Sequence, residues 1–202
     1  ITANTSEAIQ SGNTITVTLD TTDTVLLTAP SAGTTLVGTY TVGATDTSAG
    51  LTVSSFSIGT VADTAGNAMS STTLPAASSI FGTKTIIIDT TAPTVSSFTM
   101  SDTDLKSGDT STVTIVFSES VAGFSNSDVT VVNGALASMT SSDNITWTGT
   151  YTPTADVEDA TNVLTLGTTW TDTAGNVYGG SSTDTANFTI DTTSPTVSSF
   201  TM

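Results

Sequence analysis

One segment occurs twice and sets the organisation of the chain: DTTAPTVSSFTM at residues 89–100 recurs as DTTSPTVSSFTM at residues 191–202, with Ala92 replaced by Ser194. Three shorter motifs recur in the same order. TSEAI at 5–9 answers FSESV at 117–121, GTYT at 38–41 answers GTYT at 149–152, and DTAGN at 63–67 answers DTAGN at 172–176. A repeat of roughly 100 residues is the size of a whole domain. The chain therefore contains two related domains in tandem.

From residue 94 to residue 190, short runs rich in Val, Ile, Thr and Phe predict β-strands. These runs are 94–100, 112–117, 129–132, 136–140, 145–152, 163–166 and 186–190. Turn residues such as Asn133-Gly134 separate them, and no stretch has the apolar period of a helix. Because the chain has no Cys, we expect an all-β protein of tandem immunoglobulin-like antiparallel β-sandwiches without disulfides.

The motifs also predict domain boundaries that are out of phase with the chain. We expect a first domain over 1–88 that lacks its first strand, a linker over 89–93, a complete second domain over 94–190, and a linker with one further strand over 191–202. Either the chain is a window on a longer array, or the last segment fills the vacant edge in a neighbouring chain. The candidates for such a strand exchange are Thr196, Val197, Phe200 and Met202.

The charge balance excludes several functions. The chain has 18 acidic residues, two basic residues and no His, which gives a net charge of −16. It has no basic patch for nucleic acid, and it has no imidazole or thiol for acid–base or nucleophilic catalysis. No apolar run is long enough for membrane insertion. We therefore expect a protein that is not an enzyme.

The predicted strand order brings several carboxylates to one place. Glu119 ends the second strand of its domain and Asp172 opens the loop after the sixth, so both should lie beside Asp89 of the linker. Asp46 of the first domain should approach the same linker, and Asn176 is a further oxygen donor. Carboxylates at close range repel each other unless a cation neutralises them, and Ca²⁺ prefers such oxygen ligands. The alternative is that DTAG forms only a turn whose Asp accepts backbone N–H groups, while Asp89 caps an extended linker.

The same repeat logic predicts partial calcium sites elsewhere. Glu7 and Asp63 would complete a site with a linker upstream of Ile1, and Asp191 would belong to a site completed by a following repeat. The acidic connection that contains Asp156, Glu158 and Asp159 is expected to be a solvated loop.

Taken together, DTTAPTV, FSESV, VEDATNVLTL and DTAGN resemble the bacterial Ig-like repeats of giant RTX-type adhesins and biofilm-associated surface proteins. The resemblance is strong over 89–202 and looser over 1–88, where TLPAASSIFGTKTIIIDTTAP at 73–93 is similar to a sister type of the repeat. It implies secreted extender domains at the bacterial cell surface, with adjacent similar repeats as partners and Ca²⁺ at or near the linkers. The resemblance gives the linker-acid role to Asp89 and Asp191, the strand-end role to Glu7 and Glu119, and the turn role to Asp63 and Asp172.

Three functional hypotheses follow. The leading one is a structural spacer of a secreted surface adhesin or fibre with calcium-stiffened linkers. The second is a self-assembling extracellular filament subunit in which strand 196–202 complements the first domain of a neighbouring chain. The third is a carbohydrate- or ice-binding module, which would need an exposed Thr array or an aromatic platform. Most aromatic residues fall on strand positions and are expected in the core, whereas Trp170 is left open as a ligand contact.

Overall fold

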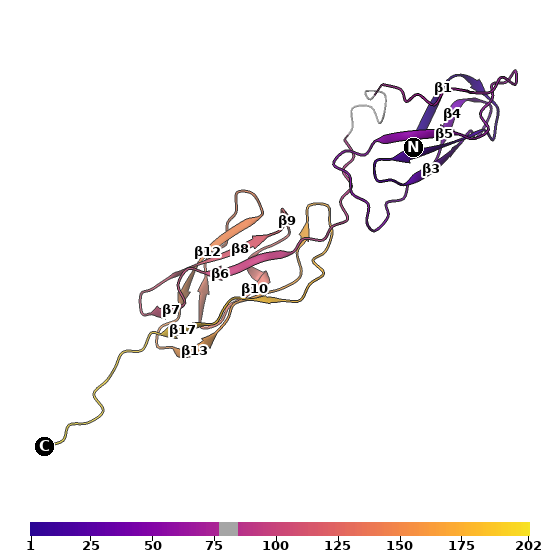
Figure 1. Ribbon diagram of the computed structural model, residues 1–202. Coiled ribbons are helices and arrows are strands. Elements are labelled where there is room, and N and C mark those ends of the chain that lie inside the picture. Colours follow the sequence, from indigo (N-terminus) through magenta and orange to yellow (C-terminus); the bar gives the residue numbers. More distant parts are fainter. Residues whose placement is uncertain (77–84) are drawn as a thin grey trace. The chain divides into compact units, whose positions relative to one another are not determined.

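The computed structural model describes residues 1–76 and 85–202 (Figure 1). Lys84, one of the two basic residues, lies outside the described residues. The described residues form β-strands and one short 3₁₀ turn, η2 (Asn126–Asp128), and they divide into two compact units, Ile1–Thr90 and Thr91–Met202. The expected all-β fold of Ig-like sandwiches without disulfides is confirmed.

The second unit contains a four-stranded antiparallel sheet with the order β11-β12-β8-β6. Its strands are β6 (Val95–Met100), β8 (Ser111–Phe117), β11 (Gly134–Leu136) and β12 (Thr146–Pro153). In β8 the alternation of Thr with larger apolar residues turns Val113, Ile115 and Phe117 into the core. The alternating pattern in the sequence is therefore the cause of the buried face.

The opposite side of this unit is built from shorter strands. One sheet has the order β13-β17-β7, with β13 (Glu158–Asn162), β17 (Phe188–Asp191) and β7 (Asp104–Lys106). A second has the order β10-β14-β16, with β10 (Val129–Thr130), β14 (Thr165–Leu166) and β16 (Thr183–Asp184). The third is the pair β15 (Thr171–Asp172) and β9 (Val121–Ala122).

Two details of this side differ from the expectation from sequence. Glu158 and Asp159 begin strand β13 rather than lying in a solvated loop, because β13 pairs with β17. The pairing of β17 with β7 is parallel, not antiparallel. After β6 the chain bends and continues as β7, in the other sheet, where it runs in the same direction as β17.

Aromatic side chains fill the core of the second unit. Trp170, Tyr151, Phe117 and Phe188 are fully buried. The Trp170 ring stacks on Tyr178 with a centroid separation of 4.5 Å, and its indole N–H donates to the carbonyl of Gly167 at 3.1 Å. Full burial of a Phe side chain such as Phe117 contributes about 1.5–3 kcal/mol. Trp170 is thus a core residue with its polar atom satisfied, and it offers no exposed platform for a ligand.

The first unit contains one five-stranded antiparallel sheet with the order β1-β4-β3-β2-β5. Its strands are β1 (Thr2–Ile9), β2 (Thr14–Leu19), β3 (Thr24–Thr28), β4 (Gly33–Val37) and β5 (Val53–Ile58). Leu19, Leu27 and Leu36 are among its fully buried side chains. The GTYT motif at 38–41 follows β4 instead of lying in a strand, whereas the copy at 149–152 lies within β12.

Candidate metal centre

The DTAGN motif of the second unit forms a tight turn organised by Asp172. One carboxylate oxygen, Oδ1, accepts hydrogen bonds from the backbone N–H groups of Gly175 at 2.7 Å and Asn176 at 2.9 Å, and Oδ2 accepts one from the Asn176 side chain at 2.7 Å. Gly175 has a φ of 98°, a conformation that favours glycine. The turn therefore depends on the residue types at its first, fourth and fifth positions.

Electrostatics keep Asp172 ionised although it is only 1% exposed. Burial raises the pKa of its carboxyl, but the hydrogen bonds from Asn176, Gly175 and Ala174 together outweigh that effect, and the net pKa is lowered. The turn thus presents a buried negative charge with its orientation fixed. Because a carboxylate has about four lone-pair positions, these bonds leave it able to bind a cation as well.

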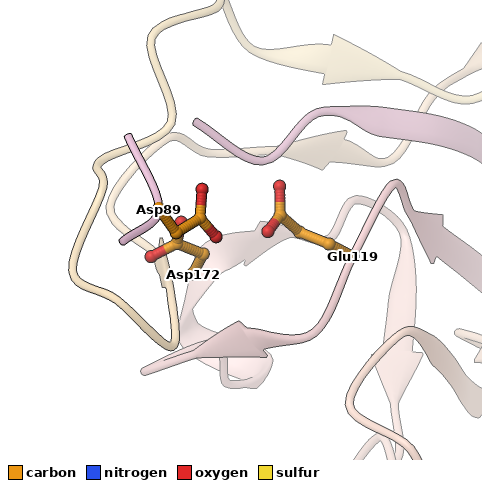
Figure 2. A group of neighbouring side chains, drawn as sticks. All are labelled: Asp89, Glu119 and Asp172. Carbon is orange, nitrogen blue, oxygen red and sulfur yellow. The ribbon is translucent and has the colours of Figure 1, made fainter. Parts of the chain in front are cut away.

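Glu119 and Asp89 lie next to this carboxylate. One oxygen from each of Asp89, Glu119 and Asp172 lies within 4.8 Å of the other two. Figure 2 shows the Glu119 side chain pointing toward the carboxylates of Asp89 and Asp172. Asp89 and Glu119 are half-buried, so water screens this cluster only in part.

The start of β6 and the end of β8 hold the segment after Asp89 in place. Ser118 N–H donates to the carbonyl of Thr94 at 2.9 Å, and Thr94 N–H donates to the Ser118 hydroxyl at 2.8 Å. The Asn176 side chain donates to the carbonyl of Thr91 at 3.3 Å. Sequence reasoning missed the role of Ser118, although a Ser at this position in both TSEAI and FSESV was a signal that could have revealed it.

The donor set fits a hard divalent cation. Calcium binds carboxylate and carbonyl oxygens at about 2.3–2.6 Å, so two oxygens on opposite sides of one ion are about 5 Å apart. The 4.8 Å limit on the separations in this cluster is compatible with one shared ion. Without nitrogen or sulfur ligands, the cluster is a poor match for zinc or copper.

Comparison with known families identifies the domain that contains this cluster. Residues 89–190, just over half of the chain, match the bacterial Ig-like domain. The chain belongs to this family. The matched stretch begins at Asp89 and includes Glu119 and Asp172, so all three acids lie within one bacterial Ig-like domain. Such domains are typically non-catalytic structural modules and often occur in surface proteins.

Two other comparisons gave no relatives: neither the curated proteins nor the solved structures include a match to this chain. Within residues 1–76 and 85–202, no helix is long and apolar enough to cross a membrane.

The two remaining candidates for the cluster, Asn176 and Asp46, both contact the linker 89–93. Asn176 lies beside the cluster of the Ig-like domain, where its amide N–H groups support Asp172 and the linker. Asp46 is not one of the three clustered acids. Its carboxylate accepts hydrogen bonds from the Tyr40 hydroxyl at 2.5 Å and from the Gly43 N–H at 2.6 Å, and these bonds lower its pKa. Asp46 therefore organises a loop of the first unit.

The first unit carries a counterpart of two of the three acids. Glu7 and Asp63 both line a cavity of about 260 Å³ beside Asn67. The Asn67 side chain donates to Asp63 at 2.7 Å and its backbone N–H does the same at 2.7 Å, and these bonds lower the pKa of Asp63. The two DTAGN turns thus share the bonds from Asn to Asp, whereas the Gly66 N–H donates to the backbone carbonyl of Asp63 at 3.1 Å instead of to its carboxylate.

The remaining acids of the second unit are placed separately. Asp191 ends β17 and accepts hydrogen bonds from the backbone and hydroxyl of Thr193. Asp156 is exposed, and Asp159 accepts hydrogen bonds from Asn133 and from Thr161. Through these hydrogen bonds Asp159 holds Asn133 and Thr161 in place.

Proposed function

We propose that this chain is an extender module of a secreted bacterial surface adhesin or fibre, in which Ca²⁺ bound by Asp89, Glu119 and Asp172 fixes the linker 89–93 to the domain that follows it. The observation that supports this proposal is the close approach of three carboxylates, with one oxygen of each within 4.8 Å of the others. Membership of the bacterial Ig-like family supports the structural role.

The charge distribution favours an external cation for this cluster. The chain has only two basic residues. Lys84 lies outside the described residues, and Lys106 pairs with Asp109 at 3.0 Å. Three carboxylates at such short range repel one another strongly when they are partly buried. A divalent cation removes this repulsion, and its binding free energy then adds to the stability of the folded domain.

Calcium would also change the mechanics of the linker. Each residue that becomes ordered loses backbone entropy of about 1–2 kcal/mol, so residues 89–93 stay in one conformation only when contacts compensate. The bonds from Asn176 to Thr91 and from Ser118 to Thr94 supply part of this compensation. An ion bound to Asp89 would supply a further anchor at the first residue of the linker. A module anchored in this way transmits force instead of folding back on itself.

Thermal unfolding with 5 mM CaCl₂ and with excess chelator tests calcium binding. We expect calcium to raise the unfolding temperature of the Ig-like domain 89–190 in the parent chain. Asp89→Asn, which keeps the shape of the side chain but removes its charge, should lose most of this rise. Asp156→Asn is the matched control, because Asp156 is exposed and has a φ of 57°, which Asn tolerates. An equal calcium effect in all three proteins would contradict the proposed site.

The stiffening is tested by a distance distribution between spin labels on Ser31→Cys and Ser142→Cys, one in each unit and both exposed. Because the chain has no other Cys, labelling is specific. Calcium should narrow the distribution of distances between the two labels in the otherwise unchanged chain. It should not narrow this distribution in the variant that also carries Asp89→Asn. A distribution that is equally broad with and without calcium would contradict the mechanical part of the proposal.

A further inference from the structure

The segment that leads into the linker is bound to the first unit by a loop that precedes β5, residues 43–52, named here the clamp loop. Ser48 N–H donates to the carbonyl of Ile88 at 2.8 Å, and Ile88 N–H donates to the carbonyl of Ser48 at 2.9 Å. Leu51 N–H donates to the carbonyl of Ile86 at 2.8 Å. The Ile88 side chain is buried in the core of the first unit. Residues 86–88 therefore belong to the packed part of this unit.

The clamp loop also holds the residue that follows Asp89. The Thr90 hydroxyl donates to the backbone carbonyl of Asp46 at 3.0 Å. Ile88 and Thr90 are the two sequence neighbours of Asp89, so the loop fixes the backbone on both sides of this acid. A carboxylate on a fixed backbone loses little conformational freedom when it binds an ion.

The carboxylate of Asp20 holds the centre and the end of the clamp loop. Its Oδ2 accepts a hydrogen bond from the Ser48 hydroxyl at 2.6 Å, and its Oδ1 accepts one from the Thr52 N–H at 3.0 Å. The Ser48 hydroxyl also accepts a bond from the Gly50 N–H at 3.1 Å. The bond from Ser48 is the main reason why the pKa of Asp20 is lowered, and the bond from Thr52 adds to it. Asp20 is therefore ionised at neutral pH, where bonds to its charge are strong.

Asp46 holds the start of the clamp loop. Its carboxylate is occupied by the Tyr40 hydroxyl and the Gly43 N–H, and the residue is buried. Its backbone carbonyl is the group that accepts the bond from Thr90. Asp46 thus acts on the linker through its backbone.

The turn that presents Asp20 is strained. Thr22 has a φ of 75°, which is uncommon for a β-branched residue. Thr22 N–H donates to the carbonyl of Leu19 at 3.0 Å, and Leu19 N–H donates to the carbonyl of Asp23 at 2.8 Å. Such a conformation persists where the surrounding structure fixes it. The bonds that Asp20 makes with Ser48 are among those that do so here.

The second unit has the same arrangement with different partners. The sequence IDTT occurs at 88–91 and again at 190–193. Ile190 is fully buried in β17, as Ile88 is buried in the first unit. The Thr192 hydroxyl donates to the carbonyl of Thr154 at 2.8 Å, as that of Thr90 donates to Asp46. A buried Ile before the acid and a bonded Thr after it therefore occur at both copies of the motif.

We propose that Asp20, Ser48 and Thr90 are positioning residues for the metal centre, because they hold the backbone around Asp89 in place before an ion binds. The effect on calcium affinity rests on the proposed calcium function. The clamp itself does not, since its hydrogen bonds form without an ion. Loss of the clamp should weaken calcium binding about tenfold, the factor expected when the backbone of one residue must be ordered on binding.

Amide hydrogen exchange of the calcium-free chain, followed by NMR, tests the clamp. We expect the Ile88 N–H to exchange about tenfold faster in Ser48→Ala and in Thr90→Val than in the parent chain, because each variant loses a hydrogen bond that closes the loop. The N–H of Val17, a buried residue of β2, should keep its parent rate, which shows that the unit is folded. Thr47→Val is the matched control, since Thr47 is an exposed residue of the same loop.

Isothermal titration calorimetry with CaCl₂ tests the positioning role. Ser48→Ala and Thr90→Val should bind calcium about tenfold more weakly than the parent chain, with the same number of ions bound, because all three carboxylates of the cluster remain. Thr47→Val should bind calcium like the parent chain. Asp89→Asn, which removes a ligand, should abolish binding at the cluster.

The two measurements separate the possible failures. The clamp is wrong if the Ile88 N–H exchanges at the parent rate in both Ser48→Ala and Thr90→Val. Faster exchange at Ile88 together with an unchanged calcium affinity would overturn the positioning role. A parent chain that binds no calcium would contradict the proposed function and with it the positioning role, while the exchange rates would still decide whether the clamp exists.

Discussion

Asp143 shows how one side chain in this Thr-rich chain defines the start of a strand. Its Oδ1 accepts hydrogen bonds from the backbone N–H groups of Thr146 at 2.8 Å and Ile145 at 2.9 Å, and from the Ser141 hydroxyl at 2.9 Å. The next residue, Asn144, has a φ of 57° and turns the chain into β12. The Asp143 carboxylate thus satisfies the backbone donors of the turn before the ladder of β12 begins.

The pKa of Asp143 gives a pH-dependent prediction at this scale. The hydrogen bonds from Thr146 and Ile145 lower the pKa of Asp143 below its ordinary value of 3.8. The unfolded chain therefore binds the proton more tightly than the folded chain. The stability from Asp143 is fully present above about pH 4 and is lost as the pH falls through the lower folded pKa. In urea unfolding of the second unit between pH 5 and pH 2.5, we expect Asp143→Asn to lose less stability on acidification than the parent chain. Ser142→Ala, a change at the exposed neighbour, should keep the parent pH dependence, and a parent-like slope in Asp143→Asn would contradict this account.

At the scale of elements, the two copies of VSSFTM show that sequence alone does not decide whether a segment is a strand. As β6 the segment pairs with β8, and at 197–202 the same residues are exposed. We expect Phe98→Ala to destabilise the second unit by about 3–5 kcal/mol, because it leaves a cavity in the core. Phe200→Ala should change the stability of the dilute, monomeric chain by less than about 0.5 kcal/mol. Denaturant unfolding followed by tryptophan fluorescence measures both effects, since the only two Trp residues, Trp147 and Trp170, lie in the second unit. Similar losses from the two substitutions would contradict the assignment of Phe98 to the core.

The same element scale explains what the sequence could and could not predict. Strands such as β8 and β12 were predictable because their apolar residues alternate over a full strand length. The short strands β7 and β13 were not, since their polar sequences become strands only through pairing with β17. Counting strands also led to the three acids that the structure brings together, Asp89, Glu119 and Asp172. It did not reveal that Asp46 is engaged by Tyr40 and Gly43, because those contacts form within an irregular loop that has no periodic signal.

At the scale of the whole molecule, the net charge of −16 gives a prediction that separates general screening from specific binding. Like charges spread over a folded surface repel one another, and added salt screens this repulsion over about 10 Å at 0.1 M. We expect NaCl to raise the unfolding temperature of the chain between 10 and 300 mM, and tetramethylammonium chloride to do the same, because screening does not depend on the identity of the ion. Calcium bound by Asp89 should raise the unfolding temperature further, and this rise should persist in 300 mM NaCl. Asp89→Asn should remove the rise caused by calcium, while the response of this variant to NaCl should stay close to that of the parent chain. Differential scanning calorimetry of the two proteins in each salt measures these effects. If calcium acts only through its ionic strength, the rise that it causes will be reproduced by NaCl at matched ionic strength, and the acids of the cluster then serve only as turn and linker residues.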